Sequence, residues 1–121
     1  MRRILFESSA LCSEGQFIGG VREGTHNNWY SSGQLRATGA YVTNYREGYW
    51  VYFHENGQVA QEGRHANHHM EGLWSTYDET GLMRSTGVYA RGQEQGVWSY
   101  YVTGHLEAQR SGNYLDGELV R

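Results

Sequence analysis

The sequence predicts an all-β protein, a single-layer, curved or twisted antiparallel meander of about nine strands built from successive hairpins. Three observations lead to this fold class. Aromatic residues and glycines recur at a fixed interval of 24 residues, as at Trp50, Trp74 and Trp98. Each interval holds two short segments rich in aromatics and valine, bounded by Gly, Asn and Ser turns. No 3.6-residue helical periodicity occurs. Self-similarity at a fixed period is the signature of a repeat array.

The repeat is carried by several columns of residues that keep this interval together. The template reads G-x-W-x-x-[aromatic]-x-x-x-G-x-[aliphatic]-x-x-x-G-x-[aromatic], where x is any residue. Two of the glycine columns are Gly24, Gly48, Gly72 and Gly96, and Gly15, Gly39, Gly63 and Gly87. The aliphatic column is Leu11, Leu35, Val59 and Met83. Chance would not align so many columns in one register, so we expect one repeat unit to build the whole domain.

The columns divide the chain into one repeat domain over residues 1–121. Residues 1–23 are predicted to form an N-terminal half-repeat cap, residues 24–47, 48–71 and 72–95 three repeats, and residues 96–121 a degenerate last repeat with a C-terminal cap. The copies differ where His26 takes the tryptophan position and where Gly104 arrives one residue early. Atypical terminal copies are expected of caps.

Each repeat is predicted to be a hairpin closed at its Asn-Gly position. Asn56-Gly57 favours a type I′ turn, with Ser32-Gly33 and Thr80-Gly81 at the same place in the other copies. The second connection, such as "VTNYREG", is longer and polar. A two-residue turn at Asn56-Gly57 would pair His54 with Val59, Tyr52 with Gln61 and Trp50 with Gly63.

This register predicts which side chains share a face. Trp50 is expected to lie over Gly63, and the glycine column is expected to leave room for the ring. Val59 and Met83 are placed on the same face as the tryptophans, and Phe53 is placed on the opposite face. A bulge in the tryptophan strand would move Phe53 to the tryptophan face, and that alternative stays open.

Composition excludes several classes of function. Ten basic residues, all arginine, against 13 acidic ones give a net charge of −3, so nucleic acid is not an expected partner. The single cysteine, Cys12, excludes an internal disulfide and a zinc site built on cysteine pairs. The start "MRRILFESSA" has an apolar run too short for a signal peptide or a transmembrane segment. We therefore expect a soluble, cytoplasmic protein.

The residues that could carry chemistry have simpler interpretations. His65, His68 and His69 could suggest a metal site, but His65 occupies an aromatic column and the other two lie in a polar turn. Glu55, Asp78 and Glu79 flank turns, where polar residues are common. Cys12 is expected to be a small packed residue. We predict no catalytic residue, no metal site and no cofactor, because no nucleophile, base and orienting group converge in the repeat.

The strongest candidate binding feature is a second aromatic column, accompanied by two arginines. The aromatic side chains recur every 24 residues on the face opposite the tryptophans, and aromatic and arginine residues are enriched at binding hot spots. The alternative is that the column forms part of the core. The candidate partner-binding residues are Trp29, Phe53, Tyr77, Tyr101, Arg36 and Arg84.

The template resembles the MORN repeat, and in particular the MORN-variant repeat of bacterial YwqK-type antitoxin proteins. The resemblance rests on "GYWVYFHENGQVAQEG", "GLWSTYDETGLMRSTGVYARG" and "GVWSYYVTG", and it extends over roughly residues 11–117. It implies a sheet of successive hairpins with a binding or scaffolding role. It also implies an antitoxin or immunity role, which is the role given to many bacterial members of that family. No catalytic residues belong to the repeat, so none is implied here.

The leading hypothesis is a non-enzymatic protein-binding module, a cytoplasmic antitoxin or immunity protein that neutralises a toxin by direct binding. Binding rather than catalysis follows from the residues, and the antitoxin role follows from the resemblance. One alternative is a structural or membrane-associated MORN scaffold, including a homodimer formed through the sheet edge. Another is a small ligand or glycan bound on the aromatic face.

Overall fold

The protein is a single antiparallel sheet. The computed structural model describes residues 2–5 and 11–120, and these residues form twelve strands and no helix. The all-β fold class predicted from the sequence is confirmed. The strands are β1 (Arg2–Leu5), β2 (Leu11–Ile18), β3 (Val21–Trp29), β4 (Leu35–Val42), β5 (Tyr45–Phe53), β6 (Val59–Ala66), β7 (His69–Tyr77), β8 (Met83–Ala90), β9 (Gln93–Val102), β10 (His105–Leu106), β11 (Gly112–Leu115) and β12 (Glu118–Val120).

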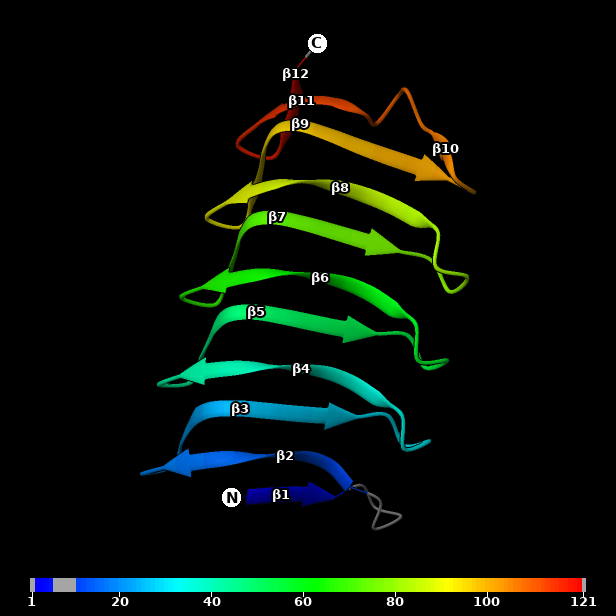
Figure 1. Ribbon diagram of the computed structural model, residues 1–121. Coiled ribbons are helices and arrows are strands. Elements are labelled where there is room, and N and C mark those ends of the chain that lie inside the picture. Colours follow the sequence, from blue (N-terminus) through cyan, green and yellow to red (C-terminus); the bar gives the residue numbers. More distant parts are fainter. Residues whose placement is uncertain (1, 6–10, 121) are drawn as a thin grey trace.

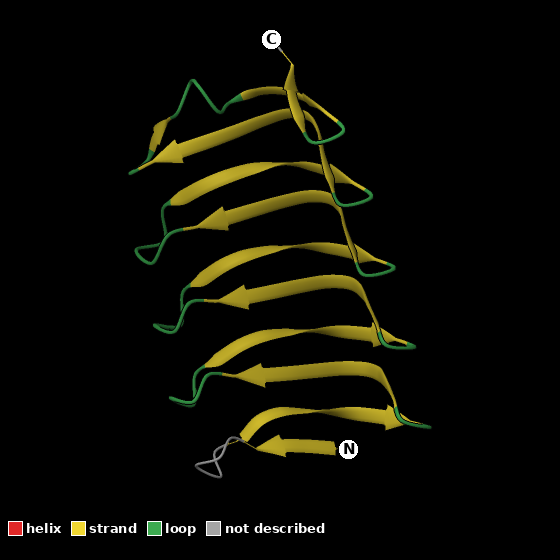
Figure 2. Cartoon of the chain, turned by 180° about the vertical axis from the view of Figure 1, so that it is seen from behind, coloured by secondary structure: helices red, strands yellow, loops and turns green. Residues whose placement is uncertain are grey.

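The strands follow one another across the sheet in chain order. Each of β1 to β9 pairs with the next, β11 and β12 follow β9, and the short β10 pairs with β9 beside this path. The sheet is open, and Figures 1 and 2 show its two margins formed by turns, with the N- and C-termini at opposite ends. The strands beyond the expected nine lie at these ends, because β1 pairs along β2 and the last copy is divided into short strands.

The two margins of the sheet use different turns. The tighter, two-residue turn lies at the second connection and not at the Asn-Gly position, so that prediction was wrong. At the second connection, Val42 pairs with Tyr45, which leaves a two-residue loop. Its residues Thr43 and Asn44 have φ values of 48° and 70°, as a type I′ turn requires. Asn67-His68 and Arg91-Gly92 repeat this conformation in the next two copies.

The Asn56-Gly57 position is instead a three-residue loop. The His54 amide donates to the Gln58 carbonyl at 2.8 Å, and the Gly57 amide donates to the His54 carbonyl at 3.0 Å. Gly57 has a φ of 91°, whereas the φ of Asn56 is not the positive value that a type I′ turn would require. A glycine at the third loop position is typical of this longer hairpin connection.

A β-bulge next to this loop restores the predicted register. Trp50 pairs with Gly63 and Tyr52 with Gln61, as predicted, but Phe53 rather than His54 pairs with Val59. The extra loop residue shifts the pairing by one, and the bulge between Val59 and Gln61 shifts it back. The predicted face of the aliphatic column is therefore wrong. Val59 lies on the Phe53 side, and Met83, which pairs with Tyr77, does the same in the next copy.

The rings of Trp50, Trp74 and Trp98 each cover the glycine of the preceding strand, not the glycine with which their own backbone pairs. A Cβ built on Gly39 would lie inside the Trp50 ring, and Gly63 has the same relation to Trp74. The prediction that Trp50 covers Gly63 is thus wrong in its partner, although each tryptophan of this column does require a glycine. The Trp50 indole also donates its N–H to the Ala40 carbonyl at 3.0 Å, so the buried polar group is satisfied.

A second irregularity explains how a single sheet buries these rings. Between two regular pairs, Gly48, Tyr49 and Trp50 of β5 lie opposite Gly39 alone on β4. Gly48 has a φ of 76°, a conformation that suits glycine. Figure 1 shows the strand bending near its start, and β7 and β9 bend in the same way. The bend and the neighbouring rings leave Trp50 only 1% exposed.

Candidate functional site

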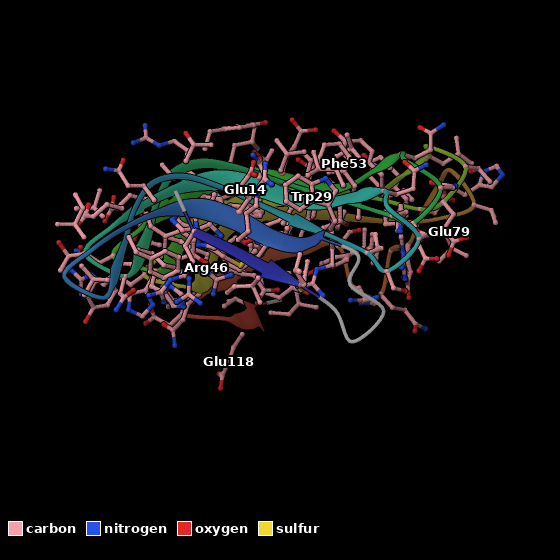
Figure 3. All side chains as sticks on the ribbon, turned by 90° about the horizontal axis from the view of Figure 1, so that it is seen from below. Glu14, Trp29, Arg46, Phe53, Glu79 and Glu118 are labelled. Atoms are coloured by element: carbon pink, nitrogen blue, oxygen red, sulfur yellow. The ribbon has the colours of Figure 1, made fainter. Side chains whose placement is uncertain are left out.

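The two faces of the sheet carry different sets of side chains. The tryptophan face is the one that holds Trp50, Trp74 and Trp98. Side chains alternate along a strand, so the predicted aromatic column points the other way. Figure 3 shows Trp29 and Phe53 on one side of the ribbon and Arg46 on the other. The ladder face is the one that holds Trp29, Phe53, Tyr77 and Tyr101.

Ring contacts fill the tryptophan face along the whole array. Successive ring centroids lie between 4.8 and 6.4 Å apart, and most of the contacts are edge-to-face, the geometry that aromatic pairs favour. The column runs through Phe17, His26, Tyr41, Trp50, His65, Trp74, Tyr89, Trp98, Tyr100 and Tyr114. This face is the core of the protein, and its side chains are engaged with one another.

The ladder face is only partly covered. Its aromatic side chains are half-buried, and three of them lie opposite an aliphatic partner: Trp29 opposite Leu35, Phe53 opposite Val59 and Tyr77 opposite Met83. The bulge described above supplies these aliphatic neighbours. The aromatic column therefore packs along the sheet surface while keeping part of each ring accessible to solvent.

The two arginines predicted to accompany this column lie at bulges. Arg36 and Arg84 are exposed, and each is the extra residue between two regular pairs. Arg84 also lines a hollow of about 160 Å³ together with Ser85 and Tyr100. Among the described residues, the arginines that stack on aromatic rings are others: Arg2, Arg22 and Arg110.

A second set of exposed apolar side chains lies beside the aromatic column on the ladder face. Tyr49 is 55% exposed, Leu73 65% and Val97 68%, and they occupy equivalent positions in successive copies. The hollows of about 360 and 220 Å³ on this face meet at Glu62 and Tyr77. The ladder face is therefore hollowed into a groove across β5, β6 and β7, and Tyr49 and Leu73 line it with exposed apolar surface.

Glu62 is the acidic side chain at the centre of this groove. The Tyr49 hydroxyl donates a hydrogen bond to its carboxylate. This hydrogen bond, with smaller effects of burial and of the Glu62 charge, raises the pKa of Tyr49 to about 12. The tyrosine therefore remains a neutral donor at physiological pH. Sequence analysis missed Glu62 and Tyr49, because neither belongs to a repeated column of one residue type.

The three clustered histidines lie in different environments. His65 is buried in the ring column and 3.0 Å from the Tyr52 hydroxyl, and its burial lowers its pKa to about 4. His68 occupies the type I′ turn, where its Nε2 lies 2.8 Å from the Arg46 guanidinium. His69 is exposed at the start of β7. The sequence run thus places one ring in the core and two at the margin.

The carboxylates at the turns serve the backbone. Asp78 accepts hydrogen bonds from the amides of Thr80 and Leu82 at 2.9 and 3.0 Å, and the Thr80 hydroxyl is the main cause of its lowered pKa. At the other margin, Glu47 accepts from the Asn67 amide at 2.6 Å. In the same way, Glu23 accepts from the Thr43 amide and Glu71 from the Arg91 amide, each 20 residues further along the chain. Their signal in the sequence is a glutamate before Gly24, Gly48 and Gly72, whereas Gln95 precedes the equivalent Gly96.

One repeat of the chain is identified by comparison with known families. A family model described as MORN repeat variant matches residues 46–67. These residues are a MORN repeat variant. The match covers β5 from Arg46 onward, β6 and the loop between them, so Tyr49 and Glu62 lie inside it. A MORN repeat indicates a binding or scaffold module. A comparison with curated proteins finds no match. Within the described part of the chain, no helix is long and apolar enough to span a membrane.

Proposed function

We propose that this protein is a non-enzymatic, cytoplasmic protein-binding module that uses its ladder face to hold a protein partner. The observation that carries the proposal is the difference in coverage between the faces. The tryptophan face is closed by its own rings, whereas Tyr49, Leu73 and Val97 remain exposed beside the half-buried aromatic column. Contiguous exposed apolar side chains on a soluble protein mark interaction sites.

The partner that we propose is a toxin, which the protein neutralises by covering it. The MORN repeat at residues 46–67 supports a binding role, and the resemblance to YwqK-type antitoxins supports the choice of a toxin. The candidate contact residues remain Trp29, Phe53, Tyr77 and Tyr101 on the ladder face, with Arg36 and Arg84 at the neighbouring bulges.

A capture experiment followed by a growth assay tests this proposal. The tagged protein is used as bait in lysate of its native cell, next to a Phe53→Ala, Tyr77→Ala variant and a control bait that carries Thr103→Ala at an exposed turn. We expect that the wild-type and control baits capture one protein in common. The Phe53→Ala, Tyr77→Ala bait should fail to capture that protein. Expressed alone, that protein should arrest growth, and co-expression of this chain should restore it.

The two halves of the proposal can fail separately. A captured partner that does not affect growth would contradict the antitoxin role but leave protein binding in place. If no protein distinguishes the wild-type bait from the ladder variant, the binding role of this face is wrong.

A scaffold that assembles through the sheet edge is the second candidate. It is favoured by β1, an edge strand whose Ile4 and Leu5 are 41% and 56% exposed. An exposed edge strand offers unpaired backbone groups to another chain. Sedimentation equilibrium decides this candidate, because a mass that stays monomeric at high protein concentration argues against self-assembly.

A further inference from the structure

The groove on the ladder face contains an acidic residue flanked by aromatic and aliphatic side chains from three strands. Tyr49 comes from β5, Glu62 from β6, and Leu73 and Tyr77 from β7. Tyr49, Glu62, Leu73 and Tyr77 together line the hollow of about 360 Å³, and Glu62 and Tyr77 also line its neighbour of about 220 Å³. We refer to these four residues as the Glu62 groove.

This combination occurs at one place in the described array. The positions equivalent to Tyr49 hold Thr25, Leu73 and Val97, and the positions equivalent to Glu62 hold Glu14, Thr38 and Thr86. A tyrosine hydroxyl therefore meets a carboxylate here and not at the corresponding points of the other copies. Copies with other residues at these positions form the same pair of strands, so the coincidence of Tyr49 and Glu62 calls for a separate explanation.

The Glu62 carboxylate has capacity left for a ligand. Over residues 2–5 and 11–120, its hydrogen bonds and ion pairs consist of the contact from Tyr49, while the ion pairs of the sheet join Arg3 to Glu14 and Arg110 to Glu107. An ionised carboxylate has about four acceptor positions. Arg64 lines the same hollow but is exposed and forms no ion pair with Glu62.

The chemistry of the groove selects a cation with an apolar stem. The carboxylate attracts positive charge, aromatic faces bind cations through their ring quadrupole, and Leu73 offers aliphatic surface. A guanidinium satisfies all three, since it is planar, pairs with a carboxylate through two parallel hydrogen bonds and stacks on aromatic rings. The protein's net charge of −3 also favours a basic partner.

We propose that the Glu62 groove binds an arginine side chain presented by the protein partner. The guanidinium donates to the free carboxylate oxygen positions of Glu62 and lies against the rings of Tyr49 and Tyr77, and the arginine stem packs on Leu73. This inference rests on the proposed protein-binding function and names the group that the ladder face recognises.

An NMR titration with a short peptide tests the groove without the natural partner. The probe is acetyl-Leu-Arg-Leu-amide, and its matched control contains citrulline, a neutral residue of the same shape, in place of arginine. We expect amide shifts that concentrate at residues 49, 62, 73 and 77 with the arginine peptide. The citrulline peptide should bind about tenfold more weakly or worse, because it lacks the charge.

Two charge-matched variants separate the groove from general electrostatics. Glu62→Gln keeps the shape and an acceptor for Tyr49 and should weaken the arginine peptide about tenfold or more. Glu14→Gln removes the same charge from the same column, where Thr25 stands at the position of Leu73 and Arg3 pairs with the carboxylate, and should leave binding unchanged. Arg64→Gln should strengthen binding, since it removes a competing cation from the rim. Equal thermal unfolding curves would verify that the variants are folded.

Several results would overturn the inference. The first is an arginine peptide that does not bind or that shifts amide signals away from the groove. The second is an equal loss of peptide affinity in Glu62→Gln and Glu14→Gln. The third is a lysine peptide that binds as tightly as the arginine peptide. If the wild-type protein self-associates and Glu62→Gln abolishes this, the arginine belongs to a second copy of this chain and not to a different protein. In the capture experiment, a Glu62→Gln bait that keeps the full amount of partner would contradict this inference and leave the proposed function standing.

Discussion

The tryptophan face and the ladder face are built by the same strands, but different residues determine them. On the tryptophan face, Trp50, Trp74 and Trp98 each cover a glycine of the preceding strand, and the ring contacts continue from copy to copy. On the ladder face, equivalent positions hold residues as different as Tyr49 and Leu73. The comparison separates what the fold requires from what it leaves open. Side chains that differ between copies, such as Glu62, are the ones to examine for function.

The largest expected difference between the faces is in stability. Trp74→Ala should lower the free energy of unfolding by about 3 to 5 kcal/mol, because it removes a buried ring and leaves a cavity. Tyr77→Ala removes a half-buried ring from the ladder face and should lower it by less than about 1.5 kcal/mol. Urea denaturation measures both. If the two variants lose equal stability, the ladder face is part of the core and the contrast between the faces is wrong.

A double-mutant cycle tests which ring covers which glycine. Gly63→Ala should lower the free energy of unfolding by about 2 to 3 kcal/mol, because its Cβ would overlap the Trp74 ring. In a Trp74→Ala background this loss should disappear, whereas in a Trp50→Ala background it should persist. Sucrose added equally to all samples keeps the weaker variants folded for the denaturant titrations. A loss that disappears with Trp50→Ala instead would restore the assignment predicted from backbone pairing.

The buried histidine of the tryptophan face predicts a pH dependence. The folded pKa of His65 is about 4, below the value near 6.5 expected in the unfolded chain. The unfolded state therefore binds more protons between these values, so stability should fall by about 2 kcal/mol as pH is lowered from 6.5 to 4. His65→Tyr gives the residue found at the equivalent positions 41 and 89 and should reduce this slope. Denaturation at a series of pH values measures it, and identical slopes would show that His65 is not responsible.

The smallest expected effect compares the two margins. Arg91 has a φ of 52° in a type I′ turn, a conformation that asparagine adopts more readily than arginine. Arg91→Asn should raise the free energy of unfolding by about 0.5 to 1 kcal/mol, because it creates the Asn-Gly pair favoured there. Glu55→Asn, in the three-residue loop of the other margin, is the control and should change stability little. A larger gain at residue 55 would contradict the assignment of the tight turn.

Much of the fold could be predicted because the repeat samples the same constraints several times. The 24-residue columns indicated the meander of hairpins, and the pairing of Trp50 with Gly63 followed from a two-residue turn assumed at Asn56-Gly57. Two local errors cancelled in that prediction. The loop at residues 55–57 is one residue longer than an Asn-Gly pair suggests, which shifts the pairing by one residue. The bulge before Gln61 shifts the pairing by one residue in the opposite sense and restores the predicted register. A register averaged over a hairpin is thus more predictable than its turn or its bulges.

The candidate site shows the same division. The sequence predicted the aromatic column of Trp29, Phe53, Tyr77 and Tyr101, since a repeated residue type is visible as a column. It did not predict the groove at Glu62, whose neighbours Tyr49 and Tyr77 are 13 and 15 positions away along the chain. Only the pairing of β5, β6 and β7 brings these side chains to one surface.

The sequence by itself determined the period, the fold class and the need for a glycine beneath the rings of Trp50, Trp74 and Trp98, because those requirements recur from copy to copy. The tertiary structure decided which glycine lies under which ring and which face stays open. Both depend on the three residues Gly48, Tyr49 and Trp50 opposite Gly39, which bend the strand and turn the ring toward the preceding one. The repeated columns contain no information on that bend, so the ring positions could not be read from them.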